Sequence, residues 1–419
     1  MSITTIWLVR VSVCMAAVCG CASQVSSASF HMAELVGRPL VHARTPDQAV
    51  PQPKPYIWLS PAEIRALPIA GEPGCNSRCS AAWTLVREAA AVSPARPNLD
   101  HLEDETGHFV LAKALVAVRL GESEFATDLR DEVVALLEEV IGSENGASAL
   151  YVGRNLAMYV IAADIIDLPV TRPDFDEFVF KPWLRSLANK EFFDRTLRSC
   201  HEDRPNNWGT HCGASRIAAA AYLNDRAEIA AAARIFQGWL GDRDSHAGFT
   251  FDATAFTWMS DSACPASNQD CQPRPLNPLG ATLNGHNVDG VVVDDQRRSE
   301  RHRFRWPPKY TIYVYGALGG AVVQAGILQR FGFDAWHWSD EAIRRAVEWM
   351  FDDRDGKKKW DTCQDEDKRY VLDVVDRAYG SNFVNRMNCS LEKPSGPGRN
   401  IAWTSWTHQP PIVAEPAVH

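Results

Sequence analysis

The segment CHEDRPNNWGTHC, residues 200–212, gathers amides, an indole, two imidazoles and a guanidinium directly before an Ala-rich stretch. Its proline cannot lie inside a helix, so we expect the helix to begin near residues 209–210. The side chains of Asn206 and Asn207 and the first helical N–H groups would then face one place, and such donors can hold a carboxylate. His211 follows Asn207 by four residues and would share its helix face. An N-cap beside a structural histidine is the simpler alternative.

A second group of candidates lies in DDQRRSERHRFRWPPKY, residues 294–310, which is strongly basic in a chain of formal net charge −9. Charged runs usually form solvated faces, and we expect this for most of its arginines. A guanidinium is nevertheless the best bidentate partner of a carboxylate, so one or two of them are expected to bind an anionic ligand. The candidates are Arg298 and Arg305.

Three tyrosines, Tyr310, Tyr313 and Tyr315, begin the small-residue stretch YTIYVYGALGGAVVQAG. A tyrosine beside cationic groups has a stabilised phenolate and can exchange protons with a substrate. Amphipathic core packing is the alternative for at least two of the three. Upstream, His286 lies in the glycine-flanked segment NGHNVDG, where it could be a base, a ligand or a turn residue.

Helical patterns dominate the elements that must position these residues. Ser60 before Pro61 and Glu63 is typical of a helix start, and apolar residues then recur at three- to four-residue spacing. We expect helices at residues 109–121, 131–142, 151–167, 176–189, 211–223, 227–240, 311–331 and 340–352. GVVVDD, residues 290–295, is a short candidate strand, and residues 242–310 form the longest non-helical stretch. This pattern predicts an all-α fold, an (α/α) toroid that is an incomplete barrel of helical hairpins with long irregular active-site loops.

The N-terminus predicts export. Residues 1–21 carry one arginine and a short apolar run ending in VCGC, which resembles a bacterial lipoprotein signal with Cys21 as the lipidated residue. Cleavage near Ala22 or Ala28, giving a soluble periplasmic protein, is the alternative. We expect a linker at residues 22–54, a catalytic domain at 55–410 and a tail at 411–419. The predicted location is the periplasm or the outer membrane, with membrane contact only through the lipid anchor.

Cysteine usage supports an oxidising compartment. Outside residues 1–21, eight of the 11 cysteines remain, an even number that suits disulfides. Zinc is the alternative, but the sequence has no CxxC, HExxH, HxH or HxxxH spacing, so we expect no metal and no other cofactor. The expected local pairs are Cys75 with Cys79, Cys200 with Cys212, Cys264 with Cys271, and Cys363 with Cys389.

The chain resembles the alginate lyase superfamily of polysaccharide lyases, and more closely polysaccharide lyase family 38. The resemblance rests on GRNLAMYVIAADII, HEDRPNNWGTH, GHNVDGVVVDDQRR, YTIYVYGAL and AWTSWTH, and covers roughly residues 56–408. Two positions depart from the superfamily pattern. Trp208 stands where its NNH motif has histidine, and Trp306 stands where an arginine usually precedes the catalytic tyrosine.

The resemblance implies β-elimination on a 1,4-linked polyuronate, glucuronan or alginate, without metal or cofactor. Asn207 with Arg298 or Arg305 would neutralise the substrate carboxylate, and Tyr313 would act as base and then acid. His211 or His286 would be the base for guluronate, in which the C5 proton and O4 lie on opposite sides. The side chains expected to contact substrate are those of Asn206, Trp208, Arg154, Arg305, Tyr310 and His108.

Two other functions fit the same sequence. A glycoside hydrolase would use paired carboxylates, for which Asp294, Asp295, Asp373 and Asp376 are available. A non-catalytic lipoprotein would bind acidic glycans through tryptophan and arginine. The acidic composition argues against nucleic acid as a partner, and we expect a monomer.

Overall fold

The computed structural model describes residues 54–193, 195–260, 273–360, 370–387 and 394–409. These residues belong to one compact unit, Pro53–His419. The protein is mostly helical, with 58% in helices and 2% in strands, which confirms the predicted all-α class. The expected signal peptide with Cys21, most of the linker, the 411–419 tail and four of the paired cysteines (Cys264, Cys271, Cys363 and Cys389) lie outside the described residues.

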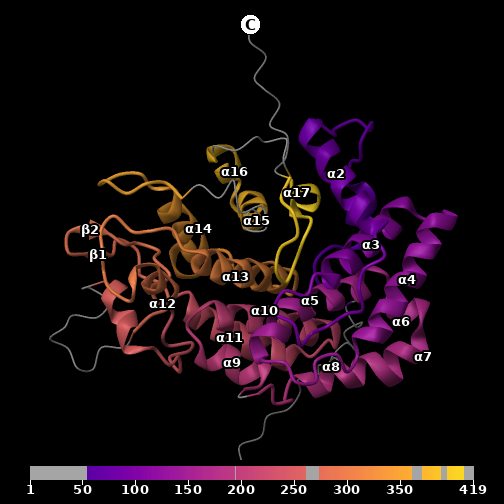
Figure 1. Cartoon of the computed structure of the whole chain (residues 1–419), viewed down its shortest axis with the longest axis horizontal. Helices are drawn as coiled ribbons and strands as arrows, with labels where there is room; N and C mark the ends of the chain where they lie inside the picture. The colour runs from indigo at the N-terminus through magenta and orange to yellow at the C-terminus, as the bar shows by residue number, and fades with distance from the viewer. Residues whose placement is uncertain (1–53, 194, 261–272, 361–369, 388–393, 410–419) are drawn as a thin grey trace, which may run out of the picture. The chain divides into compact units, whose positions relative to one another are not determined.

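Figure 1 shows the arrangement of the helices and strands. They are α1 Pro61–Ala66, α2 Ser77–Ala90, α3 Thr106–Leu120, α4 Glu124–Val140, α5 Ala149–Ile165, α6 Leu168–Thr171, α7 Pro173–Phe175, the π-helix η1 Asp176–Phe180, α8 Lys181–Leu187, α9 Leu197–Asp203, α10 Asn207–Tyr222, α11 Arg226–Trp239, the 3₁₀-helix η2 Ala253–Trp258, β1 Thr282–Leu283, β2 His286–Asn287, α12 Val293–Gln296, the 3₁₀-helix η3 Arg297–Glu300, α13 Ile312–Arg330, α14 Trp338–Phe351, α15 Tyr370–Tyr379, α16 Phe383–Arg386 and α17 Thr404–Thr407.

Local sequence signals account for several of these boundaries. Ser60 and Glu63 form the reciprocal capping box that the sequence indicates at the start of α1. Gly121, with φ of 75°, ends α3 in a conformation that a residue with a side chain rarely adopts. The predicted helices correspond to α3, α4, α5, η1 with α8, α10, α11, α13 and α14. Most ends differ by four residues or fewer, but α4 begins at Glu124, seven residues before the predicted start.

The centre of the unit is α10, which packs against α5, α9, α11 and α13. Nearly every residue of α10 is buried, because its Ala- and Gly-rich sequence lets neighbouring helices approach on all sides. A Cβ at Gly320 of α13 would lie 2.4 Å from the Thr210 carbonyl carbon, so the backbones of α10 and α13 are in direct contact. Helix α13 is long and apolar enough to cross a membrane, but 72% of its apolar window is buried in this core.

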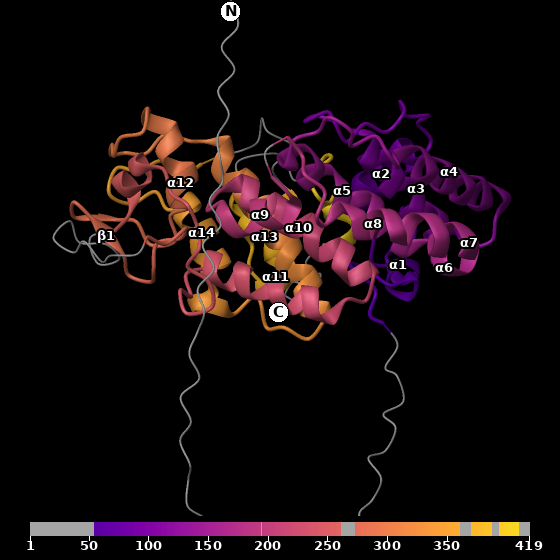
Figure 2. The same cartoon turned by 90° about the horizontal axis from the view of Figure 1, so that it is seen from below.

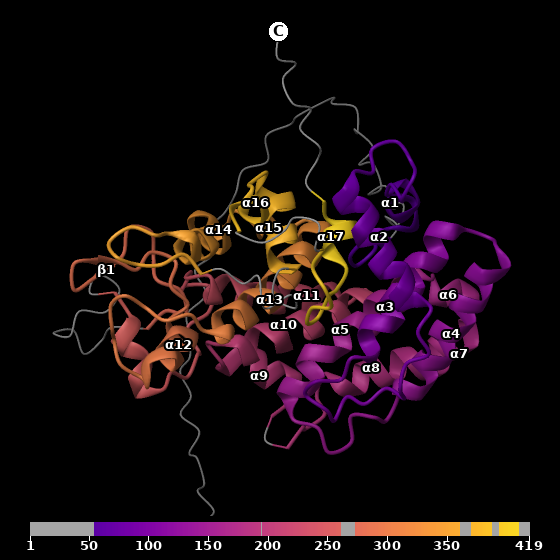
Figure 3. The ribbon, with the colours of Figure 1, turned by 45° about the horizontal axis from the view of Figure 1, so that its top comes forward.

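The other elements lie on either side of this central pair. Helices α3 and α4 are at one end of the unit, and α12 with the β1–β2 hairpin is at the other (Figure 2). Helices α5, α10 and α13 lie between them, as Figure 3 shows from another angle. The two ends of the predicted site, at α10 and α13, therefore meet in the middle of the unit.

Two local predictions are wrong. Residues 290–295 do not form a strand: Val292 makes an isolated bridge with Leu276, and α12 begins at the next residue. Helix α10 begins at Asn207 rather than near residues 209–210, because the Asn206 side chain caps the Trp208 N–H at 3.1 Å.

Candidate active site

The N-terminus of α10 is held by two adjacent carboxylates of α12. Asn206 accepts from the Trp208 N–H through Oδ1 and donates through Nδ2 to Asp294 Oδ2 at 2.7 Å. The Asn207 N–H donates to Asp295 Oδ2 at 3.1 Å. Because these bonds cap the helix, the Asn207 side chain is not needed as the cap, and its amide can bind other groups.

Arg298 joins Asn207 to Tyr313. Its Nη1 donates to Asn207 Oδ1 at 3.2 Å, its Nη2 lies 3.4 Å from Asp294 Oδ2, and its guanidinium carbon lies 4.7 Å from the centre of the Tyr313 ring. Because a guanidinium only donates, the Asn207 atom that faces it must be the oxygen. The Asn207 Nδ2 donors are therefore directed away from Arg298.

That amide nitrogen lies beside Gly316 of α13, together with His211. A Cβ at Gly316 would be 3.5 Å from Asn207 Cβ, 3.7 Å from Asn207 Nδ2 and 3.8 Å from His211 Nε2. Asn207 and His211 thus share one helix face, as their spacing predicts, and both meet α13 one turn after Tyr313. The structure brings Asn207, His211, Arg298 and Tyr313 into one cluster.

Exposure differs strongly within this cluster. Tyr313 is 40% exposed, whereas Asn207 is 8% and His211 is 2% exposed. Burial, with Arg154 as the next contribution, lowers the pKa of His211 to about 3, so its imidazole is neutral at physiological pH. Tyr313 is the member most open to a polymeric ligand.

Asp295 lies beneath the cluster. It is completely buried, and this burial raises the pKa of its carboxyl to about 8 against the opposing effect of Arg298. The neighbouring Asp294 adds to the rise, and the Asn207 N–H partly offsets it. The charge beneath Asn207 and Arg298 consequently changes near neutral pH.

The described contacts of His286 lie outside this cluster. His286 lies on β2, stacks on Trp306 with ring centres 4.3 Å apart, and pairs with Asp355. Trp306 also donates through Nε1 to the Asp355 carbonyl oxygen at 2.6 Å. His286 and Trp306 therefore form a separate aromatic group.

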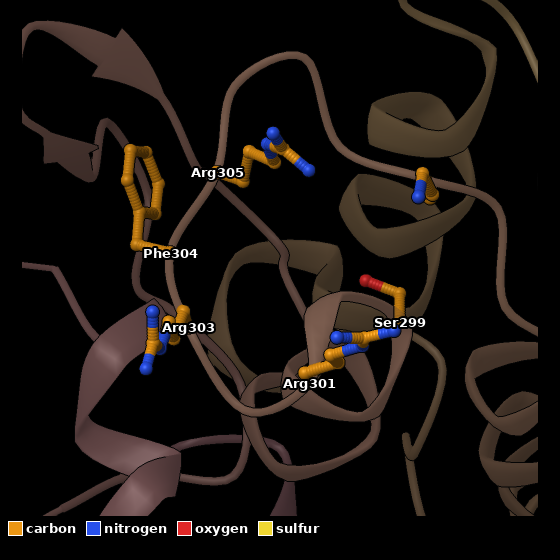
Figure 4. A pocket seen from close by; sticks show the side chains of 6 residues that line it. Ser299, Arg301, Arg303, Phe304 and Arg305 are labelled. Atoms are coloured by element: carbon orange, nitrogen blue, oxygen red, sulfur yellow. The ribbon is translucent and has the colours of Figure 1, made fainter.

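Two basic cavities, of about 700 and 590 Å³, share the side chains of Arg305 and Lys309. Figure 4 shows Ser299 and Arg301 across the first cavity from Phe304 and Arg303. None of the described residues that line either cavity is acidic. The second cavity adds Trp306, Pro307, Pro308, Tyr310, Lys358, Lys359 and Trp360.

The remaining predicted contacts lie in different surroundings. Trp208 is half-buried under the Arg204 guanidinium, whose carbon is 5.3 Å from the ring centre. Arg154 lies 3.4 Å from Glu103 and is close enough to influence His211. His108 is buried, with Nε2 2.7 Å from the Gly398 carbonyl oxygen.

One of the two predicted cysteine pairs within the described residues is bonded. The predicted Cys75–Cys79 disulfide is present. Cys200 and Cys212 are buried free thiols whose sulfurs lie 2.7 Å apart, so the predicted bond between them is not formed. The helical turn between α9 and α10 already brings the sulfurs together, and closing the bond would require an oxidant and an approach of about 0.7 Å.

Sequence reasoning missed the residues that support the cluster. Asp294 and Asp295 were candidates only for hydrolysis, whereas they anchor Asn206 and Asn207. Asn400, 189 residues beyond His211, lies 2.5 Å from its Nδ1 through Oδ1. The position of Asn400 in the sequence carries no signal for this contact, because only the tertiary fold brings it there.

Within the described ranges, no group of three or more His, Cys, Asp or Glu side chains could hold a metal ion. Comparison of the chain with protein-family models, curated proteins and solved structures finds no match.

Proposed function

We propose that the protein is an exported polysaccharide lyase that cleaves a 1,4-linked polyuronate, glucuronan or alginate, by β-elimination. The observation that carries the proposal is the contact of Arg298 with both the Asn207 amide and the Tyr313 ring. This arrangement combines donors for a carboxylate with a phenol that can transfer protons. The resemblance to family 38 lyases points to the same residues.

The first requirement of the reaction is to make the C5 proton acidic. Hydrogen bonds from Asn207 Nδ2 and the Arg298 guanidinium to the uronate carboxylate would stabilise the enediolate-like intermediate. Asp295 fixes the backbone of Asn207, and Asp294 fixes the guanidinium of Arg298. Both carboxyl groups therefore help to direct these donors toward a substrate carboxylate. Preorganised donors of this kind contribute several kcal/mol to transition-state stabilisation.

Proton transfer is assigned to Tyr313. In glucuronate and mannuronate the C5 proton and O4 lie on the same side of the sugar, so one phenol can take the first and protonate the second. Tyr313 is 40% exposed, which supports access of a polymer to this residue. His211, nearly buried and with a pKa of about 3, is a weak base, which favours these sugars over guluronate.

The basic cavities suit the remainder of the polymer. A polyuronate carries one negative charge per sugar, and the cavities combine cations with the aromatic rings of Phe304, Trp306 and Trp360. Their basic lining contrasts with the acidic chain as a whole. We propose that Arg305 and Tyr310 bind further sugar units. We also propose that the helical hairpins of the core are arranged as a toroid.

Paired-carboxylate hydrolysis receives less support. Asp294 and Asp295 are buried and hold α10, while Asp373 accepts hydrogen bonds from the hydroxyls of Ser395, Thr404 and Ser405. Asp376 accepts from two backbone N–H groups at the start of α16. All four carboxylates have structural partners.

The proposal is tested by incubating the purified protein with glucuronan, polymannuronate and polyguluronate. We expect ultraviolet absorbance from a 4,5-unsaturated uronate with at least one of the first two. Tyr313→Phe should lose the activity and retain the melting temperature, whereas the control Tyr56→Phe, whose backbone contacts Arg330 at the opposite end of α13 from Tyr313, should retain both. New reducing ends without the chromophore would indicate hydrolysis, and binding without any product would indicate a glycan-binding protein.

A further inference from the structure

Asn400 lies in a firmly held loop against α5 and α10. It is completely buried and has φ of 64°, a left-handed conformation that asparagine tolerates better than most residues. Its N–H donates to the Arg154 carbonyl oxygen at 2.9 Å. The loop is also fixed by the contact of His108 Nε2 with the Gly398 carbonyl oxygen at 2.7 Å and by the bond from Trp403 Nε1 to the His108 carbonyl oxygen at 3.0 Å.

The orientation of the Asn400 amide follows from its partners. Its Nδ2 lies 2.5 Å from the Gly153 carbonyl oxygen, which can only accept, so this atom must be the donating nitrogen. The other amide atom is then the oxygen, and it lies 2.5 Å from His211 Nδ1. Because an amide oxygen has no proton to give, His211 Nδ1 must carry the proton. In the neutral ring, Nε2 is left with a lone pair.

That lone pair is placed at the catalytic cluster. Nε2 lies 3.8 Å from the Cβ position of Gly316, and Asn207 Nδ2 lies 3.7 Å from the same point. The charged groups that influence the ring are Arg154 and Arg399, both paired with Glu103, and both disfavour a second proton on it. The imidazole is therefore an acceptor beside a donor.

We propose that Asn400 is a positioning residue that fixes His211 in the Nδ1-protonated form, so that Nε2 presents a permanent acceptor beside the Asn207 amide. In this arrangement the donors of Asn207 and Arg298 serve the substrate carboxylate, and His211 accepts a hydrogen bond without carrying a net charge. The consequence for catalysis rests on the proposed function; the protonation of His211 does not.

The decisive measurement is nitrogen-15 NMR of histidine-labelled protein, with His211→Gln to identify the resonances. We expect the wild-type ring to be neutral, with Nδ1 protonated and Nε2 unprotonated, over about pH 5 to 8. A ring protonated on Nε2, or one that becomes charged within this range, would overturn the proposal. This result needs neither substrate nor activity.

Two variants separate positioning from simple support. Asn400→Gly suits the left-handed backbone and removes the amide, so the His211 ring should populate both neutral forms. Asn400→Asp keeps an acceptor at Nδ1 but adds a negative charge, which favours the charged ring and raises the pKa of His211. If both variants fold and the His211 resonances are unchanged, Asn400 does not position the ring.

Activity gives a separate readout. If the neutral acceptor is required, kcat of Asn400→Asp should fall about tenfold for each pH unit below its new His211 pKa, while kcat of the wild-type protein stays level there. The same loss at every pH would indicate only structural damage and overturn the positioning role. If no variant or wild-type protein cleaves any polyuronate while the NMR result holds, the proposed function fails and the assignment of the His211 proton stands.

Discussion

The contact between α10 and α13 at Gly320 offers a sharp perturbation of the site. In Gly320→Ala, the new Cβ would lie 2.4 Å from the Thr210 carbonyl carbon, 2.5 Å from its oxygen and 2.6 Å from the His211 nitrogen. Ordinary contact begins near 3.4 Å, so the helices must separate by about 1 Å. The atoms are all backbone and cannot rotate away.

The cost can be estimated from these distances. Overpacking of a rigid core costs about 1–3 kcal/mol, and the upper end applies because three backbone atoms are involved. Alanine returns about 1 kcal/mol through its helix propensity. We therefore expect a net loss of about 2 kcal/mol, or a fall in Tm of about 3 °C for a unit of this length. A separation of 1 Å between Asn207 and Tyr313 should lower kcat/KM by about 100-fold.

Gly316→Ala is the matched control on the same helix. Its Cβ would make ordinary contacts, the closest at 3.5 Å with Asn207 Cβ, so stability should be unchanged or slightly higher. The methyl group would nevertheless occupy space between Asn207 and His211, so activity should fall at least about tenfold. Thermal unfolding and polyuronate cleavage are measured for both variants. Wild-type Tm and activity in Gly320→Ala would refute the argument that this backbone contact aligns the site.

Three further predictions concern the groups around the cluster. Asp295 has a native pKa of about 8, above its ordinary 3.8, so the native state retains a proton that the unfolded chain has lost and stability falls as pH rises between these values. Asp295→Asn should remove this slope, and equal slopes in both proteins by urea denaturation at pH values across that window would contradict it. Above pH 8, where Asp295 is charged, Arg298→Met should destabilise the wild-type protein by about 2–4 kcal/mol and the Asp295→Asn variant by less, because the Asp295 carboxylate loses the nearby Arg298 only in the first case, whereas Asp294 keeps its contact with Arg297 in both; an identical loss in both would disprove the coupling. A mild thiol oxidant should join Cys200 to Cys212 and block two thiols from alkylation in the unfolded chain, since their sulfurs are 2.7 Å apart; persistence of both free thiols would show that burial prevents closure.

The sequence allowed the elements and the principal residues of the site to be predicted because their signals are local. Apolar spacing and capping residues identify helices such as α3 and α1, and the asparagine pair directly precedes the Ala-rich helix that presents it. Arg298 lies in the strongly basic segment 294–310, and Tyr313 lies among the three tyrosines that begin a small-residue stretch. Their approach to Asn207 was expected from the resemblance alone and depends in the structure on the close packing of α10 and α13.

Other features depend on tertiary contacts that no local pattern encodes. The strand expected at residues 290–295 fails because Asp294 and Asp295 bind the start of α10, so this segment turns into α12. The start of α10 was misplaced because Asn206, directly after the proline, caps the Trp208 N–H, and the distant Asp295 accepts from the Asn207 N–H. Asn400 reaches His211 only through the loop anchored by His108, far away in the sequence.

The fate of the oxygen atom at the cleaved bond tests the lyase proposal most directly. The protein is incubated with glucuronan or polymannuronate in oxygen-18-enriched water, and the masses of the fragments are measured by mass spectrometry. The control is a set of fragments that is mixed with the labelled water only after cleavage. β-Elimination breaks the bond between C4 and oxygen, so we predict fragments with an unsaturated end, each lighter by one water than a hydrolysis product, and no label beyond that of the control. Saturated fragments that each carry one labelled oxygen would contradict the account and assign the protein to hydrolysis.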